Sequence, residues 1–552
     1  MRPSLPSHRL AILAATAVGM AFAFWLSVFF ADPKRPVSVE ERADRLAAEN
    51  YASGSLFAPT PASPAHWSQR LVLLDEQSGR RHPVAREASA VLLTATAGSA
   101  RTAAILAFGL AAGGLVWLLR GPLGLSLPFT SVITVAAMLA SARSQDWQMV
   151  DPTPWIILAA SACCLGAWWC HRAHPDTQAA RLLGVGLGIL LLSAPALAVV
   201  VGLAVVIDWR VQKNSRPRHA DANRHTAPLR PLLAQIGLVL LLPVLALLAR
   251  NQLVTGNPFV TPSALYRAEN VTAPAWFWQT EGAPQDGLDY VIERYDQLVA
   301  LPSAQIATPA YRSLLDTVLR GSHFFGGAGL ALLAAISALL LPARLTRPAW
   351  LLVAGTTAAV FLRFAAPLDW WLLALPACAL LAGLGLQACQ RVSQRLPSRV
   401  LCALAVTQLA FLPAAPADRP APEEYTFADN WEQIRKKIRE TSPGPHLVFV
   451  QLDDTAPARP EAAALPRDWS GLDVLLARQL GPEKDAALVA AMPERTAWRI
   501  IVFRDRIGLQ RWTPPSAATA PDAPAESDAS STPAESAKSD VTPEPAPPVA
   551  RD

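Results

Sequence analysis

Long apolar runs, separated by loops that hold most of the charge, limit what this chain can fold into. A helix of about 20 apolar residues crosses roughly 30 Å of hydrocarbon. Only 16% of the 552 residues are charged, compared with about 25% in soluble domains. We therefore expect a mainly α-helical, polytopic transmembrane bundle. The runs expected to form full spans are Leu10–Phe30, Thr102–Leu119, Leu125–Ala140, Trp155–Cys170, Leu232–Leu248, Phe325–Leu341, Leu351–Phe364, Trp371–Leu386 and Val400–Leu412.

The cations between the apolar runs predict the orientation of the chain. Short loops rich in Lys and Arg stay in the cytoplasm, and the loops of this kind are His171–Arg181, Arg210–Arg230, Arg344–Arg347 and Arg391–Arg399. The N-terminus is then cytoplasmic, and the first apolar run is expected to remain as an uncleaved anchor. Ala31–Ala88, Arg250–Ser322 and everything after about Pro413 lie outside. The pI near 9.0 follows from these loops and does not indicate nucleic-acid binding.

One apolar run, Leu182–Trp209, conflicts with this orientation because it has a basic loop at each end. A single crossing would put one of those loops outside. The Ser193-Ala194-Pro195 sequence near its middle favours a break, since proline interrupts a helix. We therefore expect two short half-helices that dip into the membrane and return, as a re-entrant or tightly folded pair.

The chain divides by composition into five parts. These are an N-terminal anchor (1–30), a first extracytoplasmic loop (31–100), a multi-span domain (101–414) with an extracytoplasmic segment (250–322), a small α/β domain (415–513) and a Pro/Ala/Ser-rich tail (514–552) expected to be disordered. In the α/β domain we expect helices at Asn430–Glu440, Leu472–Leu480 and Lys484–Met492, and strands at His446–Gln451 and Trp498–Phe503.

The first extracytoplasmic loop places carboxylates beside the membrane. Ser38 and Glu41 fit a helix capping box, and the helix should continue to Tyr51 and end at Ser53-Gly54. The acids then form a solvated helix face. In the other interpretation, Glu40 or Glu41 acts on a bound substrate, because a carboxylate can orient and deprotonate a hydroxyl nucleophile. The residues alone leave both interpretations open.

The cysteines and histidines do not predict a metal site. All six cysteines lie in or near the apolar runs, so we expect neither disulfides nor cysteine-bound metal outside the membrane. His66 and His82 lack the spacing of paired metal ligands. No cofactor is predicted, and a divalent cation stays open because two adjacent glutamates are too few ligands to argue for one.

Three motifs, in order, carry a resemblance to a known family. The first is Glu40 to Leu56, and the second is Thr255-Gly256-Asn257-Pro258-Phe259 followed by Pro262 and Tyr266. The third is Pro443 to Val450, followed by Asp473 and Arg478. Together they resemble bacterial membrane glycosyltransferases of the GT-C class, specifically the family-39-like group.

This resemblance implies an inverting transfer of a sugar from a polyprenyl-phosphate donor to an unknown envelope acceptor, at the outer face of the bacterial inner membrane. It places the catalytic carboxylate on Glu40, with Glu41 beside it. The residues it implies for donor phosphate or substrate binding are Arg81, His82, Arg86, Tyr266 and Arg363. The implied partners are the lipid-linked sugar and membrane lipid, without nucleic acid.

The sequence departs from the family pattern at three of these places. The family has Asp-Glu where this chain has Glu40-Glu41, Lys-Tyr-Pro-Pro where it has Arg81 to Val84, and His-Tyr-Ala-Ala-Pro where it has Arg363 to Pro367. Arg363 can also be a cation at the membrane interface. Two alternatives therefore stay open: a catalytically impaired relative that binds the lipid-linked sugar, and a transporter or flippase of such lipids.

Overall fold

The structure is a computed structural model that is mainly helical. It describes residues 5–29, 39–67, 71–75, 77–144, 151–173, 176–214, 229–270, 337, 340–362, 372–392, 433–452, 466–502 and 507–513. Arg363, the run Val400–Leu412, most of Phe325–Leu341 and the tail lie outside the described residues.

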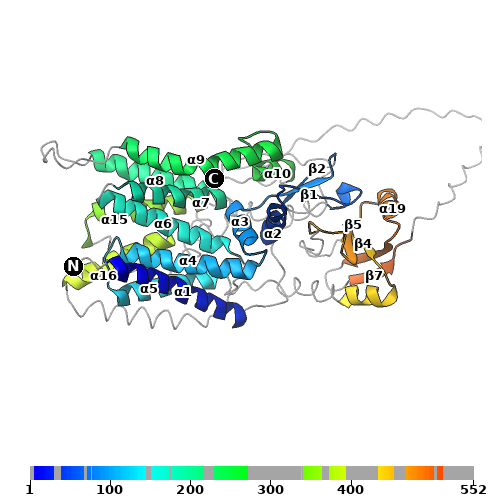
Figure 1. Cartoon of the computed structure of the whole chain (residues 1–552), viewed down its shortest axis with the longest axis horizontal. Coiled ribbons are helices and arrows are strands. Elements are labelled where there is room, and N and C mark those ends of the chain that lie inside the picture. Colours follow the sequence, from blue (N-terminus) through cyan, green and yellow to red (C-terminus); the bar gives the residue numbers. More distant parts are fainter. Residues whose placement is uncertain are drawn as a thin grey trace, which may run out of the picture. The chain divides into compact units, whose positions relative to one another are not determined.

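The apolar runs within the described residues fold as helices, shown in Figure 1. They are α1 (Leu5–Phe29), α4 (Ala100–Arg120), α5 (Leu127–Ser144), α6 (Thr153–Ala173), α7 (Thr177–Ser193), α8 (Pro195–Asn214), α9 (Leu229–Thr255), α15 (Ala343–Leu362) and α16 (Leu375–Val392). By length and composition, five of these are suited to cross a membrane: α1, α4, α6, α8 and α9. The chain is a multi-pass membrane protein.

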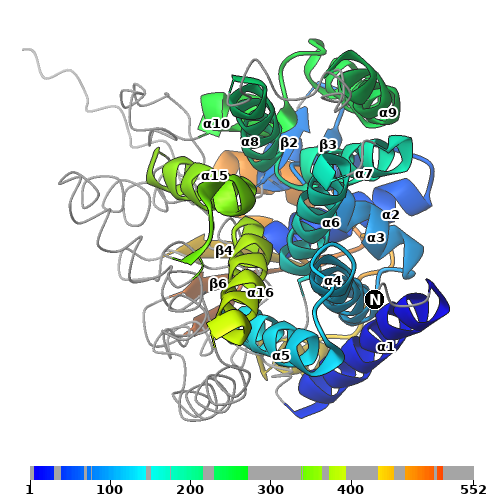
Figure 2. The same cartoon turned by 90° about the vertical axis from the view of Figure 1, so that its left-hand side faces the viewer.

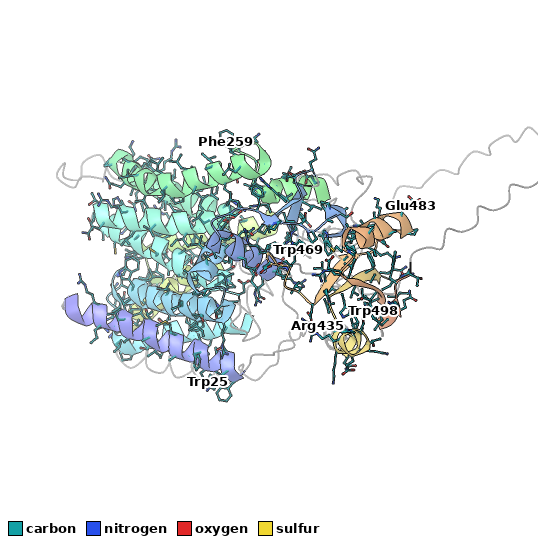
Figure 3. The ribbon with its side chains drawn as sticks, turned by 45° about the vertical axis from the view of Figure 1, so that its right-hand side comes forward. Trp25, Phe259, Arg435, Trp469, Glu483 and Trp498 are labelled. Carbon is teal, nitrogen blue, oxygen red and sulfur yellow. The ribbon has the colours of Figure 1, made fainter. Side chains whose placement is uncertain are left out.

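Helices α4 and α6 form the centre of this bundle. Figure 2 looks along the helices and shows α4 and α6 surrounded by the others. Their core includes Phe108 and Trp155, whose rings meet edge to face with centroids 4.7 Å apart. By contrast α1 and α9 bury little of their surface. Trp25 on α1 and Phe259 after α9 point outward in Figure 3, which suits residues that face lipid or the membrane interface.

The break predicted at Ser193-Ala194-Pro195 is present, but the two helices are longer than half-helices. α7 has 17 residues and α8 has 20, so they rise about 25 Å and 30 Å. α7 reaches α3 at one end of the bundle, and α8 returns to the other end. The expected shortness of the two helices is therefore wrong, and of the two alternatives the structure has the tightly folded pair. A folded pair of this length puts both flanking basic loops at the same end, which removes the conflict.

The first loop forms its own small structure between α1 and α4. It contains α2 (Val39–Ala52), the 3-10 helix η1 (Pro64–Trp67) and α3 (Glu87–Ala95). Strands β1 (Ala58–Pro59), β2 (Val72–Asp75) and β3 (Arg80–Pro83) form an antiparallel sheet in the order β1-β3-β2. The helix predicted to follow Ser38 and continue to Tyr51 is confirmed, and Gly54 takes the positive φ of 71° that its ending requires.

The C-terminal region is a four-stranded α/β unit with strand order β5-β4-β6-β7. Its strands are β4 (His446–Leu452), β5 (Val474–Arg478), β6 (Thr496–Val502) and β7 (Ile507–Arg511), and its helices are 433–441 and α19 (Pro482–Ala491). β5, β4 and β6 are parallel, and β7 is antiparallel to β6.

The helix predicted at Leu472–Leu480 is wrong, because Val474–Arg478 is strand β5. A short buried apolar run has no periodicity that separates a strand from a helix. Here the pairing of Val474–Arg478 with β4 makes this run a strand. The other helices and strands predicted for this region are confirmed, and β7 was not predicted.

Trp67 from the first loop belongs to the core of the α/β unit. On one face of the sheet, Leu447, Phe449, Leu475 and Leu488 form a core in which the Trp67 side chain is 2% exposed. The 433–441 helix covers the other face through Ile434 and Ile438. The first loop and the α/β unit, about 400 residues apart in sequence, therefore share apolar packing.

Glycines allow α1 and α4 to pack closely, and this close packing predicts how a substitution there changes stability. A methyl group on Gly109 would lie 2.9 Å from the backbone oxygen of Thr16 and 2.4 Å from Cγ of Met20, whereas one on Gly202 in α8 would meet nothing within 4 Å. We expect Gly109→Ala to lower the stability of the protein by about 1–3 kcal/mol, as overpacking does. Gly202→Ala should be neutral or stabilising, since alanine favours helix. Thermal unfolding in detergent would measure both, and equal effects would contradict the close contact.

Candidate functional site

The two predicted catalytic glutamates lie in the first turn of α2. Glu40 is exposed. Glu41 is buried, and its Oε1 accepts a hydrogen bond of 2.5 Å from Arg45 one turn later. Helical periodicity puts Glu40, Asp44 and Tyr51 on one face of α2. Along this face, Glu40 is exposed, Asp44 is buried and Tyr51 is half-buried.

Asp44 is fully buried and is held by Arg86. Its Oδ1 accepts the Arg86 backbone N–H at 2.8 Å, and its Oδ2 accepts Nε at 2.9 Å and Nη2 at 2.7 Å. Arg86 Nη1 donates to Asp151 Oδ2 at 3.0 Å. The other oxygen of Asp151 accepts the backbone N–H of Thr153, at the start of α6. One guanidinium therefore joins α2 to the end of a membrane helix.

Glu87, next to Arg86 in sequence, organises a second group of polar side chains. Tyr51 donates its hydroxyl to Glu87 Oε2, and Arg250 Nη2 lies 2.5 Å from Glu87 Oε1. Arg250 also reaches Nε2 of His82 at 3.4 Å. We call these residues, with Asp44, Arg86 and Asp151, the polar cluster. It joins α2, α3, strand β3 and the ends of α6 and α9.

Burial shifts the proton affinities of this cluster. It raises the pKa of Asp44 to about 7, although the Arg86 cation opposes the shift. It also raises the pKa of Glu87, again against its arginine partner. Burial and the Arg250 cation lower the pKa of His82 to about 4, so this imidazole is neutral at pH 7. The cluster can therefore exchange protons near neutral pH through a carboxyl group.

The two predicted phosphate-binding residues of β3 face opposite ways. Neighbouring side chains of a strand alternate between its faces. His82 lies with Phe57 on the side of the polar cluster, with ring centroids 5.7 Å apart. Arg81 is 0% exposed and donates to the carbonyls of Pro59 and Pro466. Of the predicted cations, the structure brings Arg86 into the cluster and places Arg81 in contact with the α/β unit.

Two other predicted residues are not in the polar cluster. Tyr266 is buried on the short helix α10 (Pro262–Asn270), which packs against α9 and β2. Arg363 lies outside the described residues. Their assignment to a donor site stays a prediction.

Sequence reasoning missed Asp151, Glu87, Arg250 and Tyr51 as functional candidates. Asp151 and Arg250 are ionisable residues beside the ends of apolar runs, and Glu87 begins the short helix α3. Such residues are costly near hydrocarbon and tend to be functional. Asp44 lies within the helix predicted to continue to Tyr51, and its pairing with Arg86 distinguishes it from Glu40 and Glu41.

A separate set of ion pairs marks the other end of the bundle. Asp208 on α8 is fully buried, with Arg172 of α6 at 3.2 Å and Arg347 of α15 at 3.8 Å. Asp151 and Arg172 lie at opposite ends of α6, about 30 Å apart along its axis. Arg172 and Arg347, which belong to two of the basic loops, therefore lie at one end of the bundle and the polar cluster at the other, as the predicted orientation requires.

The cluster's composition suits acid–base chemistry and anion binding. Within the described ranges, no group of three His, Cys, Asp or Glu side chains could hold a metal ion. A carboxyl with a pKa near 7 can accept a proton, and two partly buried guanidinium groups can stabilise a phosphate.

The raised pKa of Asp44 predicts how stability depends on pH. The carboxyl has a pKa of 3.8 in the unfolded reference and about 7 when folded. The folded protein therefore binds more protons in this window, and its free energy of unfolding falls as the pH rises through it. The Asp44→Asn variant lacks this titration and does not lose this stability. The thermal stability of the variant minus that of wild type should therefore increase between about pH 4 and pH 7. Exposed Asp75→Asn should show no such increase, and a pH-independent difference for Asp44→Asn would contradict the raised pKa.

Comparisons with known proteins give the following. No protein-family model matches the sequence, and no curated protein matches it significantly. Among solved structures, the chain is similar to ArnT from Cupriavidus metallidurans bound to undecaprenyl phosphate, with 14% identity and a TM-score of 0.45 over 88% of this chain and 92% of ArnT. It is also similar to the archaeal oligosaccharyltransferase AglB from Archaeoglobus fulgidus in complex with an inhibitory peptide and a dolichol phosphate, with 10% identity and a TM-score of 0.35 over 89% of this chain and 69% of AglB.

Proposed function

We propose that this protein is a membrane glycosyltransferase that moves a sugar from a polyprenyl-phosphate donor to an envelope acceptor, with inversion. The observation that carries the proposal is the buried polar cluster at one end of the bundle, where a carboxyl with a pKa of about 7 lies among two arginines. The sequence resemblance supplies the donor class. A lipid donor reaches such a site laterally through the bilayer.

Asp44 is the proposed base. The acceptor hydroxyl oxygen attacks the anomeric carbon, and its proton passes to the Asp44 carboxylate. The bond from the anomeric carbon to the phosphate oxygen breaks, and polyprenyl phosphate leaves with the bonding electrons. A phosphate is a weak base, so this departure needs no general acid.

Arg250 and Arg86 are the proposed phosphate ligands. With its three acids ionised, the cluster has one more acid than arginines. When Asp44 is protonated, the two remaining acids and the two arginines balance. The raised pKa of Asp44 therefore favours entry of an anionic headgroup near neutral pH, and the raised pKa of Glu87 acts in the same direction.

The placement of charge supports an enzyme over a transporter. A transporter usually binds its substrate near the bilayer midplane. In the described part of the bundle, the ion pairs instead gather at its two ends. The first loop and the α/β unit also place folded structure beside the polar cluster.

Substitution of the carboxylates tests the proposed base. Asp44→Asn should lower sugar transfer by about 10²–10⁴-fold, because general base catalysis contributes that much. Glu40→Gln is the matched control on the same helix and should retain activity, since Glu40 is exposed. The measurement is transfer from radiolabelled polyprenyl-phosphate sugars by purified protein in lipid.

The outcomes separate the alternatives. Loss of activity in Glu40→Gln or Glu41→Gln, with Asp44→Asn active, would move the base to the residue first predicted. Donor binding without turnover in wild type would indicate an impaired relative. If wild type neither binds nor turns over any donor in a panel of sugars, the proposal is rejected and a transporter is favoured.

The proposed base also predicts a pH profile. Asp44 must be ionised to accept a proton, so the transfer rate should fall as the pH drops below about 7. Donor binding should change the other way and weaken as the pH rises, because the cluster becomes more negative. Rates measured at saturating donor, together with separate donor affinities, would distinguish the two effects. A rate independent of pH between about 5 and 8 would exclude Asp44 as the base.

A further inference from the structure

Arg467 of the α/β unit contacts residues 49–57, here called the α2 turn, which comprise the last turn of α2 and the loop after it. Its Nη1 donates to Asn50 Oδ1 and to the Phe57 carbonyl, both at 2.9 Å. Its backbone N–H donates to Glu49 Oε2, also at 2.9 Å. Three points of one turn are therefore held by a single residue more than 400 positions later in the chain.

The same turn holds His82. Asn50 Nδ2 donates to the Leu56 carbonyl at 3.3 Å, and the Nδ1 of His82 lies 2.8 Å from that carbonyl oxygen. A carbonyl oxygen only accepts hydrogen bonds, so Nδ1 must carry the proton. In the neutral ring Nε2 then has a free lone pair, which accepts from Arg250 Nη2 at 3.4 Å. The position of Leu56 therefore selects the tautomer that His82 presents to Arg250.

We propose that Arg467 is a positioning residue of the polar cluster. By clamping Asn50 and Phe57 it fixes the intervening Leu56 carbonyl, and through it the orientation of His82 and Arg250. The α/β unit thus completes the proposed phosphate site without contacting the substrate. The effect on transfer rests on the proposed function, whereas the effect on His82 does not.

Other contacts hold the α/β unit against the first loop when Arg467 is changed. Trp67 lies in its apolar core, Arg81 donates to the Pro466 carbonyl at 3.1 Å, and His66 Nε2 lies 3.2 Å from Asp485 Oδ1. Arg467→Ala is therefore expected to loosen the turn and leave the unit docked. These three contacts do not reach the Leu56 carbonyl.

The surroundings of His82 determine whether its pKa rises or falls when Arg467 is replaced. Arg250 faces it from α9 with Glu87 of α3 behind, Arg80 lies on the same face of β3, and Asp75 of β2 pairs with Arg80. The pKa of His82 is lowered chiefly by burial. A loosened turn admits water, so the pKa should rise from about 4 toward the ordinary value of about 6.5.

The test is modification of His82 by diethyl pyrocarbonate, which acylates neutral imidazole, in the full chain in lipid nanodiscs. Peptide mass spectrometry would follow the rate at His82 against pH. Arg467→Ala should raise the rate about tenfold, as the loss of hydrogen bonds from a charged group predicts, and should shift its pH midpoint upward. Asn50→Ala should have the same effect, and the double variant should add little, because both residues act through one turn.

The control is Arg499→Ala, which removes an arginine that bonds Gln451 within the α/β unit. It should leave the His82 rate and midpoint unchanged. An unchanged His82 in both Arg467→Ala and Asn50→Ala would overturn the proposal, as would an equal change in Arg499→Ala. If His82 responds as expected but wild type transfers no sugar, the positioning role stands and the proposed function falls.

Discussion

The Arg86 guanidinium, held between Asp44 and Asp151, connects the parts of this protein that would otherwise be independent. Burying a carboxylate beside a membrane is costly unless it is paired and hydrogen-bonded. Arg86 gives Asp44 three hydrogen bonds and gives Asp151 a fourth. Since Asp44 lies on α2 and Asp151 precedes α6, the pairing fixes the first loop against the bundle. Removing Arg86 would take these hydrogen bonds from Asp44, which is fully buried, so α2 cannot easily be moved without rearranging the site.

The α/β unit extends this arrangement. Trp67 lies in its core, and Arg467 contacts the α2 turn. The first loop is therefore fixed from two sides, by the bundle through Arg86 and by the α/β unit through Trp67 and Arg467. A site built in this way has little freedom before its substrate binds, and preorganisation of this kind is what electrostatic catalysis requires.

Much of the fold could be predicted from the sequence, because it depends on patterns that are local. Apolar length predicted the helices, and Pro195 predicted the break between α7 and α8. The helix expected at Leu472–Leu480 failed because pairing with β4, a contact distant in sequence, decided between strand and helix. The site was harder to predict, because it also depends on contacts between residues distant in sequence. Glu40, Glu41 and Asp44 are similar in sequence, and only the approach of Arg86, 42 residues later, makes Asp44 different. Arg81 and His82 are adjacent in sequence, yet strand geometry separates them.

The α7–α8 pair also has a consequence for how the chain enters the membrane during synthesis. No charged residue lies between Leu182 and Ile207, and the turn at Ser193-Ala194-Pro195 carries none. Arg181, Asp208 and Lys213 all lie toward the end from which the pair starts and to which it returns. The pair can therefore insert as one helical hairpin, without moving a charge through hydrocarbon. The ion pair between Asp208 and Arg172 can form only after α8 has returned beside α6. It would then hold the end of α8 against α6, at the end of the bundle from which the hairpin inserted.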